Sequence, residues 1–246
     1  MGGGDYCLRM GAESGSMERN FPRERGPMAH DRKQHGFTFI EIIIVVAMAL
    51  TLAGFAVPQF MQALRNFRIS GDARDLHGEI LLAKMRAAAN FTAARVKFDL
   101  TNRTFVSQMW CKAVVAPCTA ANVWRNVNVG GPQPLASGIS FGVANQTLHP
   151  PSTQPALAQA PTCKQGQAGG VPWAPGAGAD EPGTTYCIMF NSRGFPVGNS
   201  GAATGSNAIY ITDGAAVQGV TVSVTGLTAT LRHDGTDTDA AHWYRH

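Results

Sequence analysis

Hydrophobic residues form one continuous run near the start of the chain and are spread periodically after it. From Phe37 to Val57 the only charged residue is Glu41. A helix of this length spans roughly 30 Å, the thickness of the hydrocarbon layer of a membrane. The run therefore predicts a transmembrane helix over 37–57. A cleaved secretory signal peptide is the alternative, although its apolar region is normally only about 7–15 residues long.

Beyond Pro58 the apolar residues repeat every three or four positions, which predicts an amphipathic helix over residues 58–93. Pro58 is expected to kink the helix rather than end it, because the periodicity continues beyond it. The repeating positions are Phe60, Leu64, Phe67, Leu76, Ile80, Ala83 and Ala87.

From residue 94 to 246 the hydrophobic period is two, which predicts strands of an antiparallel sheet packed on the amphipathic helix, an α+β fold. A hairpin is expected around a turn at Asn102. A stretch rich in glycine and proline, at about 130–183, predicts long loops inserted in this β domain. The strands are expected at 95–100, 104–109, 123–127, 139–143, 185–190, 208–212, 220–224 and 228–232.

The start of the apolar run carries a motif, His35-Gly36-Phe37-Thr38-Phe39-Ile40-Glu41. With the helix that follows, it resembles the type IV prepilin signal, G-F-T-x-x-E. The resemblance implies that a membrane peptidase cuts after Gly36 and that the new N-terminal residue, Phe37, is methylated. It further implies that Glu41 neutralises the N-terminal amine of a neighbouring subunit in a fibre core, where unpaired charges are costly. Pro58 falls where pilins often carry a kinking proline.

By this resemblance residues 1–36 are a leader that is removed. The leader is long for the family, and a compact one would begin at Met28, so we expect Met28 to be the true start. The resemblance places the mature chain in the bacterial inner membrane, crossing it once, with its C-terminal domain in the periplasm.

Four later stretches narrow the resemblance to the GspH/FimT family of minor pseudopilins. Leu81–Ala89 is followed by an Arg-Val-Lys-Phe strand, and the others are Phe190–Pro196, Ala208–Thr212 and Val220–Gly226. The resemblance implies a subunit of a pilus-like fibre, in type II protein secretion or type IV pilus assembly, with no enzymatic activity and no cofactor. Its partners would be other pilins or pseudopilins, the prepilin peptidase and methyltransferase, and the inner-membrane assembly platform.

A fibre-tip receptor that binds DNA or another ligand is the alternative function. Family members that bind DNA tend to carry a G-R-x-R sequence near the end, where this chain has Gly226-Leu-Thr-Ala-Thr-Leu-Arg232. Nucleic acid is therefore not the favoured partner.

Charge changes this picture little, because a net charge of +4 with 15% charged residues is too mild for a dedicated nucleic-acid protein. Basic residues gather between positions 65 and 97, which we interpret as a solvated helix face. A surface for DNA or for an acidic partner is the alternative. These residues are Arg65, Arg68, Arg74, Lys84, Arg86, Arg95 and Lys97.

Removal of the leader, which holds Cys7, leaves Cys111, Cys118, Cys163 and Cys187. An even number of cysteines in an exported domain predicts two disulfides. Proximity along the chain favours Cys111–Cys118 with Cys163–Cys187, among three possible pairings. A zinc site is the alternative, but the C-x2-C spacing of such sites is missing.

Two other patterns are interpreted as carrying no chemistry. Gly138-Ile-Ser140-Phe-Gly142 fits G-x-S-x-G, but the prolines after it predict loop where a nucleophile elbow needs a helix. The C-terminal end is expected to be a polar, frayed tail, with calcium binding by its aspartates as the alternative. Its relevant residues are His233, His242, His246, Asp234, Asp237 and Asp239.

Overall fold

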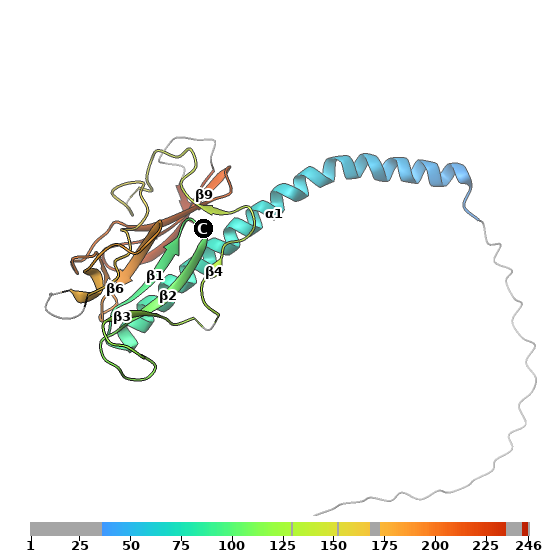
Figure 1. Cartoon of the computed structure of the whole chain (residues 1–246). Coiled ribbons are helices and arrows are strands. Elements are labelled where there is room, and N and C mark those ends of the chain that lie inside the picture. The colour runs from blue at the N-terminus through green and yellow to red at the C-terminus, as the bar shows by residue number, and fades with distance from the viewer. Residues whose placement is uncertain (1–35, 129, 152, 168–172, 235–242, 246) are drawn as a thin grey trace, which may run out of the picture. The chain divides into compact units, whose positions relative to one another are not determined.

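The computed structural model describes residues 36–128, 130–151, 153–167, 173–234 and 243–245 (Figure 1). The chain forms two compact units, one ending at Leu50 and the other beginning at Thr51. The elements are α1 (Phe39–Ala89), β1 (Ala94–Asp99), β2 (Thr104–Cys111), β3 (Val123–Asn126), β4 (Gln133–Pro134), β5 (Ser140–Phe141), the short 3-10 helix η1 (Ala174–Gly176), β6 (Thr185–Phe190), β7 (Pro196–Val197), β8 (Asn207–Thr212), β9 (Ala216–Val222), β10 (Thr228–Asp234) and β11 (Trp243–Arg245).

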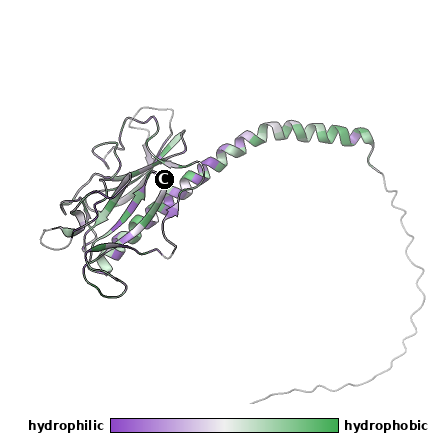
Figure 2. Ribbon diagram, viewed as in Figure 1, coloured by the Kyte–Doolittle hydropathy of each residue, from purple (hydrophilic) through white to green (hydrophobic). Residues whose placement is uncertain are grey.

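The helix α1 has two parts with different surroundings. Every residue from Gly36 to Gln62 is exposed, and hydrophobic residues cover the first part of the helix on all sides (Figure 2). The helix continues through Pro58. From Ile69 onward one face is buried, at intervals of three and four residues. The buried positions are Ile69, Asp72, Ala73, Leu76, Ile80, Ala83 and Ala87.

Two antiparallel sheets follow the helix, where the sequence predicted one. The first has the strand order β3-β2-β1-β6-β7, with β4 paired to β2, and the second has the order β11-β10-β9-β8-β5. The predicted hairpin is β1–β2, in which Asp99 faces Thr104. Asp99 Oδ1 accepts a hydrogen bond of 3.0 Å from the Asn102 N–H, which fixes the turn.

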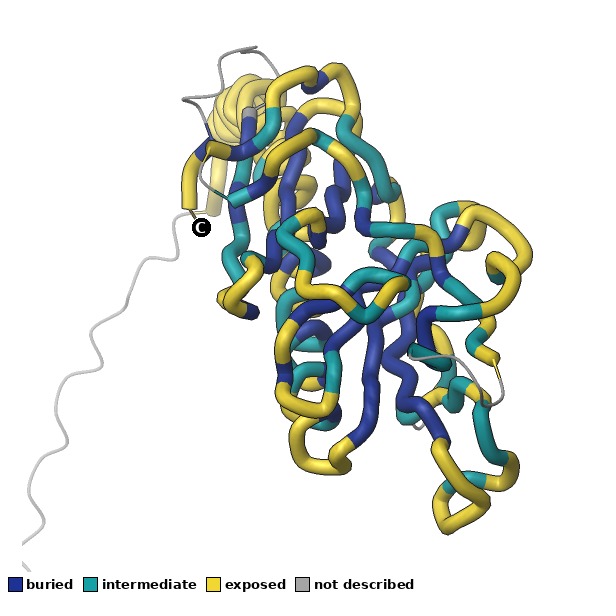
Figure 3. The backbone as a smooth tube through the Cα atoms, turned by 90° about the vertical axis from the view of Figure 1, so that its left-hand side faces the viewer, coloured by how far each residue is buried: buried dark blue, intermediate teal, exposed yellow. Residues whose placement is uncertain are grey.

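The inner faces of both sheets cover the buried stripe of α1. This confirms the α+β fold, a long N-terminal helix packed on antiparallel sheets. The strands that form this core are dark in Figure 3, while the loops between them are exposed. The core includes Val96 and Phe98 of β1, Ile188 and Phe190 of β6, Ile209 and Ile211 of β8, and Val220 and Val222 of β9.

The second sheet is buried on its outer face as well. There Tyr210, Leu231 and Trp243 form a separate apolar cluster, against which Leu157 of the inserted stretch packs. The insertion also pairs with β8, because Gln159 Oε1 accepts a hydrogen bond of 2.8 Å from the Tyr210 N–H. The glycine- and proline-rich stretch thus acts as a cover for the sheet, although most of it is loop as predicted.

Two strand predictions and the prediction of a frayed tail were wrong in detail. The strand expected at 139–143 is only the two-residue β5, and the strand expected at 220–224 is β9, which ends at Val222. A turn ends β9, since the Gly226 N–H donates to the Ser223 carbonyl at 2.8 Å. The tail expected to be frayed includes β11, which pairs with β10 at His233–Trp243. His242, His246, Asp237 and Asp239 lie outside the described residues.

Gly219 of β9 is a position where only glycine fits. A Cβ atom there would lie 2.6 Å from Cε1 of Tyr210, whereas a Cβ at Gly78 of α1 would meet nothing within 4 Å. We predict that Gly219→Ala lowers the free energy of unfolding by about 1–3 kcal/mol through overpacking. Gly78→Ala should raise it by about 0.5–1 kcal/mol, because alanine favours the helix. Urea unfolding of the full chain in detergent measures both, and equal effects would contradict this packing.

Candidate functional site

The processing segment lies immediately before α1. Gly36 and Phe37 precede the first helical residue, and Phe37 keeps 77% of its surface exposed. Thr38 caps the helix, because its Oγ1 accepts a hydrogen bond of 3.3 Å from the Glu41 N–H. The Gly36–Phe37 peptide bond is therefore non-helical and accessible, as a peptidase requires of its substrate.

Glu41 is the one charge on the exposed apolar part of α1. Its carboxylate makes no hydrogen bond or ion pair with another side chain among the described residues. Of the described helices, α1 alone is long and apolar enough to cross a membrane, and the relevant stretch is not buried within the structure. An exposed apolar surface of this length is unfavourable in water, so lipid or other subunits must surround it.

The predicted basic face of the helix is only partly formed. Lys84 Nζ donates to the Gly226 carbonyl at 2.8 Å, and Arg86 Nη1 lies 3.8 Å from Glu79 Oε2. Arg95 and Lys97 belong to β1 and are both paired with Glu181. Of the seven basic residues between positions 65 and 97, Arg65, Arg68 and Arg74 make no hydrogen bond or ion pair with another described residue.

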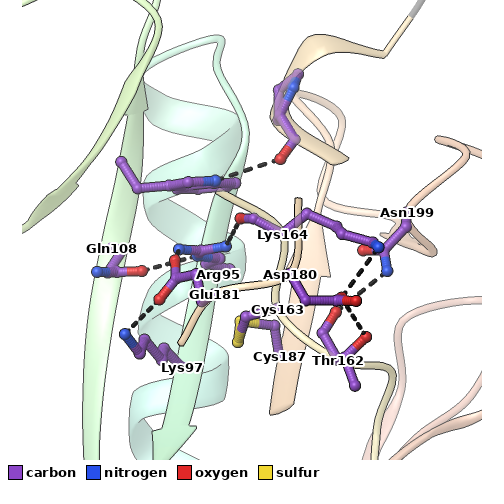
Figure 4. Close-up of a disulfide and its surroundings, with 12 residues drawn as sticks. Arg95, Lys97, Gln108, Thr162, Cys163, Lys164, Asp180, Glu181, Cys187 and Asn199 are labelled. Carbon is purple, nitrogen blue, oxygen red and sulfur yellow. Dashed lines mark hydrogen bonds and ion pairs between the residues drawn. A yellow bond between two sulfur atoms is a disulfide. The ribbon is translucent and has the colours of Figure 1, made fainter. Parts of the chain in front are cut away.

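Arg95 is the centre of a polar cluster on the outer face of the first sheet (Figure 4). The side chain is 1% exposed and pairs with Glu181, while its Nε donates to Gln108 Oε1 at 2.7 Å. Its Nη1 donates to the Lys164 carbonyl at 2.6 Å. Its guanidinium carbon lies 4.1 Å from the ring centroid of Trp124. The interpretation of Arg95 as part of a solvated face was wrong, because these groups bury it.

Burial lowers the pKa of Arg95 to about 10, against the opposing effect of Glu181. The guanidinium stays charged at neutral pH, so its carboxylate partner is needed in the folded protein. Glu181 lies on the inserted stretch, 86 positions after Arg95 in the chain. The pair thus fastens the insertion to the first sheet, and no local sequence signal could have joined these two residues.

The disulfides reinforce the same attachment. The structure pairs Cys111 with Cys118 and Cys163 with Cys187. Cys163 lies on the inserted stretch and Cys187 on β6, so this bond holds the insertion beside the Arg95 cluster (Figure 4). The other bond closes the loop after β2.

The described residues of the remaining candidate sites show no catalytic geometry. Ser140 begins β5, and residues 142–151 after it contain no helix, so the described chain forms no nucleophile elbow. His233 is buried and packs edge-on against Trp243, with ring centroids 5.2 Å apart. No group of three or more potential metal ligands occurs among the described residues.

Comparisons with known proteins agree with the motif at the start of α1. Residues 31–57 match the family model described as "Prokaryotic N-terminal methylation motif". The chain therefore carries the N-terminal signature of type IV pilin-like proteins, a structural rather than an enzymatic class.

Similarity to solved structures is low. One of the matching structures is the minor pseudopilin EpsH from the type 2 secretion system of Vibrio cholerae, at 12% identity and a TM-score of 0.37, covering 69% of this chain and 99% of that one. A likeness this weak carries no weight for the chain's role. A search of curated proteins finds no match.

The Arg95–Glu181 pair generates a stability prediction. Glu181→Gln keeps the size of the side chain but leaves the buried Arg95 charge unpaired, so we expect the free energy of unfolding to fall by about 3–5 kcal/mol. Asp180→Asn is the matched control, since Asp180 is an exposed neighbour that pairs with Lys164 at the surface. Loss of this surface ion pair should change the free energy of unfolding by less than about 1 kcal/mol. Denaturant unfolding of both variants is the measurement, and equal stability of the two would show that the buried pair is unimportant.

Proposed function

We propose that this chain is a minor pseudopilin subunit of a periplasmic pilus-like fibre, in type II protein secretion or type IV pilus assembly. One observation supports this most. The segment that matches the methylation motif, residues 31–57, includes the exposed apolar start of α1, in which Glu41 is the single charge. Its working parts are then assembly contacts rather than catalytic groups.

In this proposal the prepilin peptidase cuts after Gly36 and the amine of Phe37 is methylated. Before assembly the helix lies in the bacterial inner membrane, and the β domain lies in the periplasm. An oxidising compartment suits the two disulfides of that domain. The assembly platform then moves the helix from the membrane into a fibre made with other pilins or pseudopilins.

Glu41 has a specific part in this transfer. A carboxylate within a spanning helix costs on the order of 2.5–3.5 kcal/mol by insertion scales and needs a partner. The methylated amine of Phe37 from a neighbouring subunit supplies one, and both charges then leave water together. The apolar stripe on Phe60, Leu64 and Phe67, which the β domain leaves exposed, is available for packing against neighbouring helices.

We predict that Glu41→Gln leaves membrane insertion and cleavage intact but lowers incorporation into fibres severalfold or more. The amide keeps the size but not the charge, so a neighbour's ammonium is left unpaired in an apolar core. Intact mass spectrometry should find wild type and variant starting at N-methylated Phe37. Fibres sheared from cells and quantified for this subunit give the incorporation.

Asp75→Asn is the matched control, an equivalent loss of charge on an exposed part of α1 outside the apolar segment. It should enter fibres like wild type. Equal incorporation of the Glu41 variant would refute the pairing role. A mature N-terminus near Ala49 would instead indicate ordinary signal peptidase and refute the fibre proposal itself.

A further inference from the structure

A cationic groove runs between α1 and β10, within the unit that begins at Thr51. We define the groove by two adjoining cavities of about 430 Å³ and about 390 Å³, which share Ser70 and Arg74. Arg245 lines the first cavity and Arg232 the second. Among the described residues, no aspartate or glutamate lines either one. The groove is therefore positively charged along its length.

The nearest carboxylates on α1 belong to the opposite side of the helix. Asp72 Oδ2 accepts a hydrogen bond of 2.9 Å from the Ala136 N–H, and Asp75 interacts electrostatically with Asp72. Arg74 is exposed and has no hydrogen bond or ion pair among the described residues. Its charge is consequently available to a ligand in the groove.

The groove also contains an open strand edge. β11 pairs with β10 only from Leu231 to His233. Among the described residues no strand covers that side of β10 at Thr228–Thr230, and these residues line the first cavity. Open edges present main-chain groups that can pair with an added strand.

The floor of the groove favours a ligand with hydrogen-bond donors. Gln218 of β9 is fully buried there, and its Nε2 donates to Ser70 Oγ at 3.0 Å. Its Oε1 is buried with no donor among the described residues. A peptide carries N–H donors as well as carboxylates, whereas the phosphates of nucleic acid are acceptors only.

We propose that the cationic groove binds an extended acidic segment of another protein, which adds a strand along the open edge of β10 and directs carboxylates to Arg74 and Arg245. Main-chain pairing would provide affinity, and charge would select the partner. The inference goes beyond the fibre role and does not require it.

Fluorescence anisotropy with the full chain in detergent tests this proposal. The probes are short capped peptides of alternating Glu-Val, Lys-Val and Glu-Pro, and a single-stranded DNA. We expect Glu-Val to bind and Lys-Val to fail. The Glu-Pro peptide should bind at least about tenfold more weakly than the Glu-Val peptide, because proline lacks the N–H that a strand needs.

Arg74→Gln should weaken Glu-Val binding at least about tenfold. The matched control is Arg68→Gln, because Arg68 is exposed on the same helix and lines neither cavity. Arg245→Gln, on a different element, should act like Arg74→Gln. The proposal is overturned if the Arg68 and Arg74 variants behave alike, if Glu-Pro equals Glu-Val, or if only DNA binds in an Arg74-dependent way.

Discussion

Both sheets of this protein pack on a single apolar stripe of α1. Between Ile69 and Ala87 this helix presents buried side chains on one face, and the inner faces of two separate sheets meet on it. Toward the N-terminus Phe67, Leu64 and Phe60 lie on the opposite face of the helix, and neither sheet covers them. Folding therefore buries apolar side chains only in the C-terminal half of α1. The apolar side chains of its N-terminal half stay exposed and need another apolar environment.

Both sheets would expose their outer faces without the inserted stretch. On the second sheet the insertion packs Leu157 against the cluster of Tyr210 and Trp243. On the first sheet it brings Glu181 to the buried Arg95 and is held there by the disulfide between Cys163 and Cys187. A segment with little regular structure can cover a sheet in this way when its polar main chain is satisfied by side chains such as Gln159.

The sequence predicted what depends on nearby residues. The three- and four-residue spacing of Leu76, Ile80, Ala83 and Ala87 placed the buried face of the helix correctly, and the polar turn at Asn102 placed the hairpin.

The sequence could not predict what depends on distant partners. In the sequence, Arg95 cannot be told from the other basic residues near the helix. Its burial depends on Glu181 of the inserted stretch, which is distant along the chain. The division of the strands into two sheets and the pairing of β11 with β10 are set by long-range packing. The exposure of Phe60 and Phe67 follows instead from helix geometry, since at about 3.6 residues per turn both lie on the face opposite Leu76.

In the proposed fibre the helices of other subunits cover the exposed apolar half of α1. This packing can be measured with a photo-crosslinking residue at Val46, activated in sheared fibres, with the same residue at Thr101 in the exposed hairpin turn as control. We expect Val46 to crosslink to the N-terminal helices of other processed pilin-like subunits and Thr101 not to do so. Absence of the chain from the fibres, or crosslinks from Val46 to lipid alone, would refute the proposed packing.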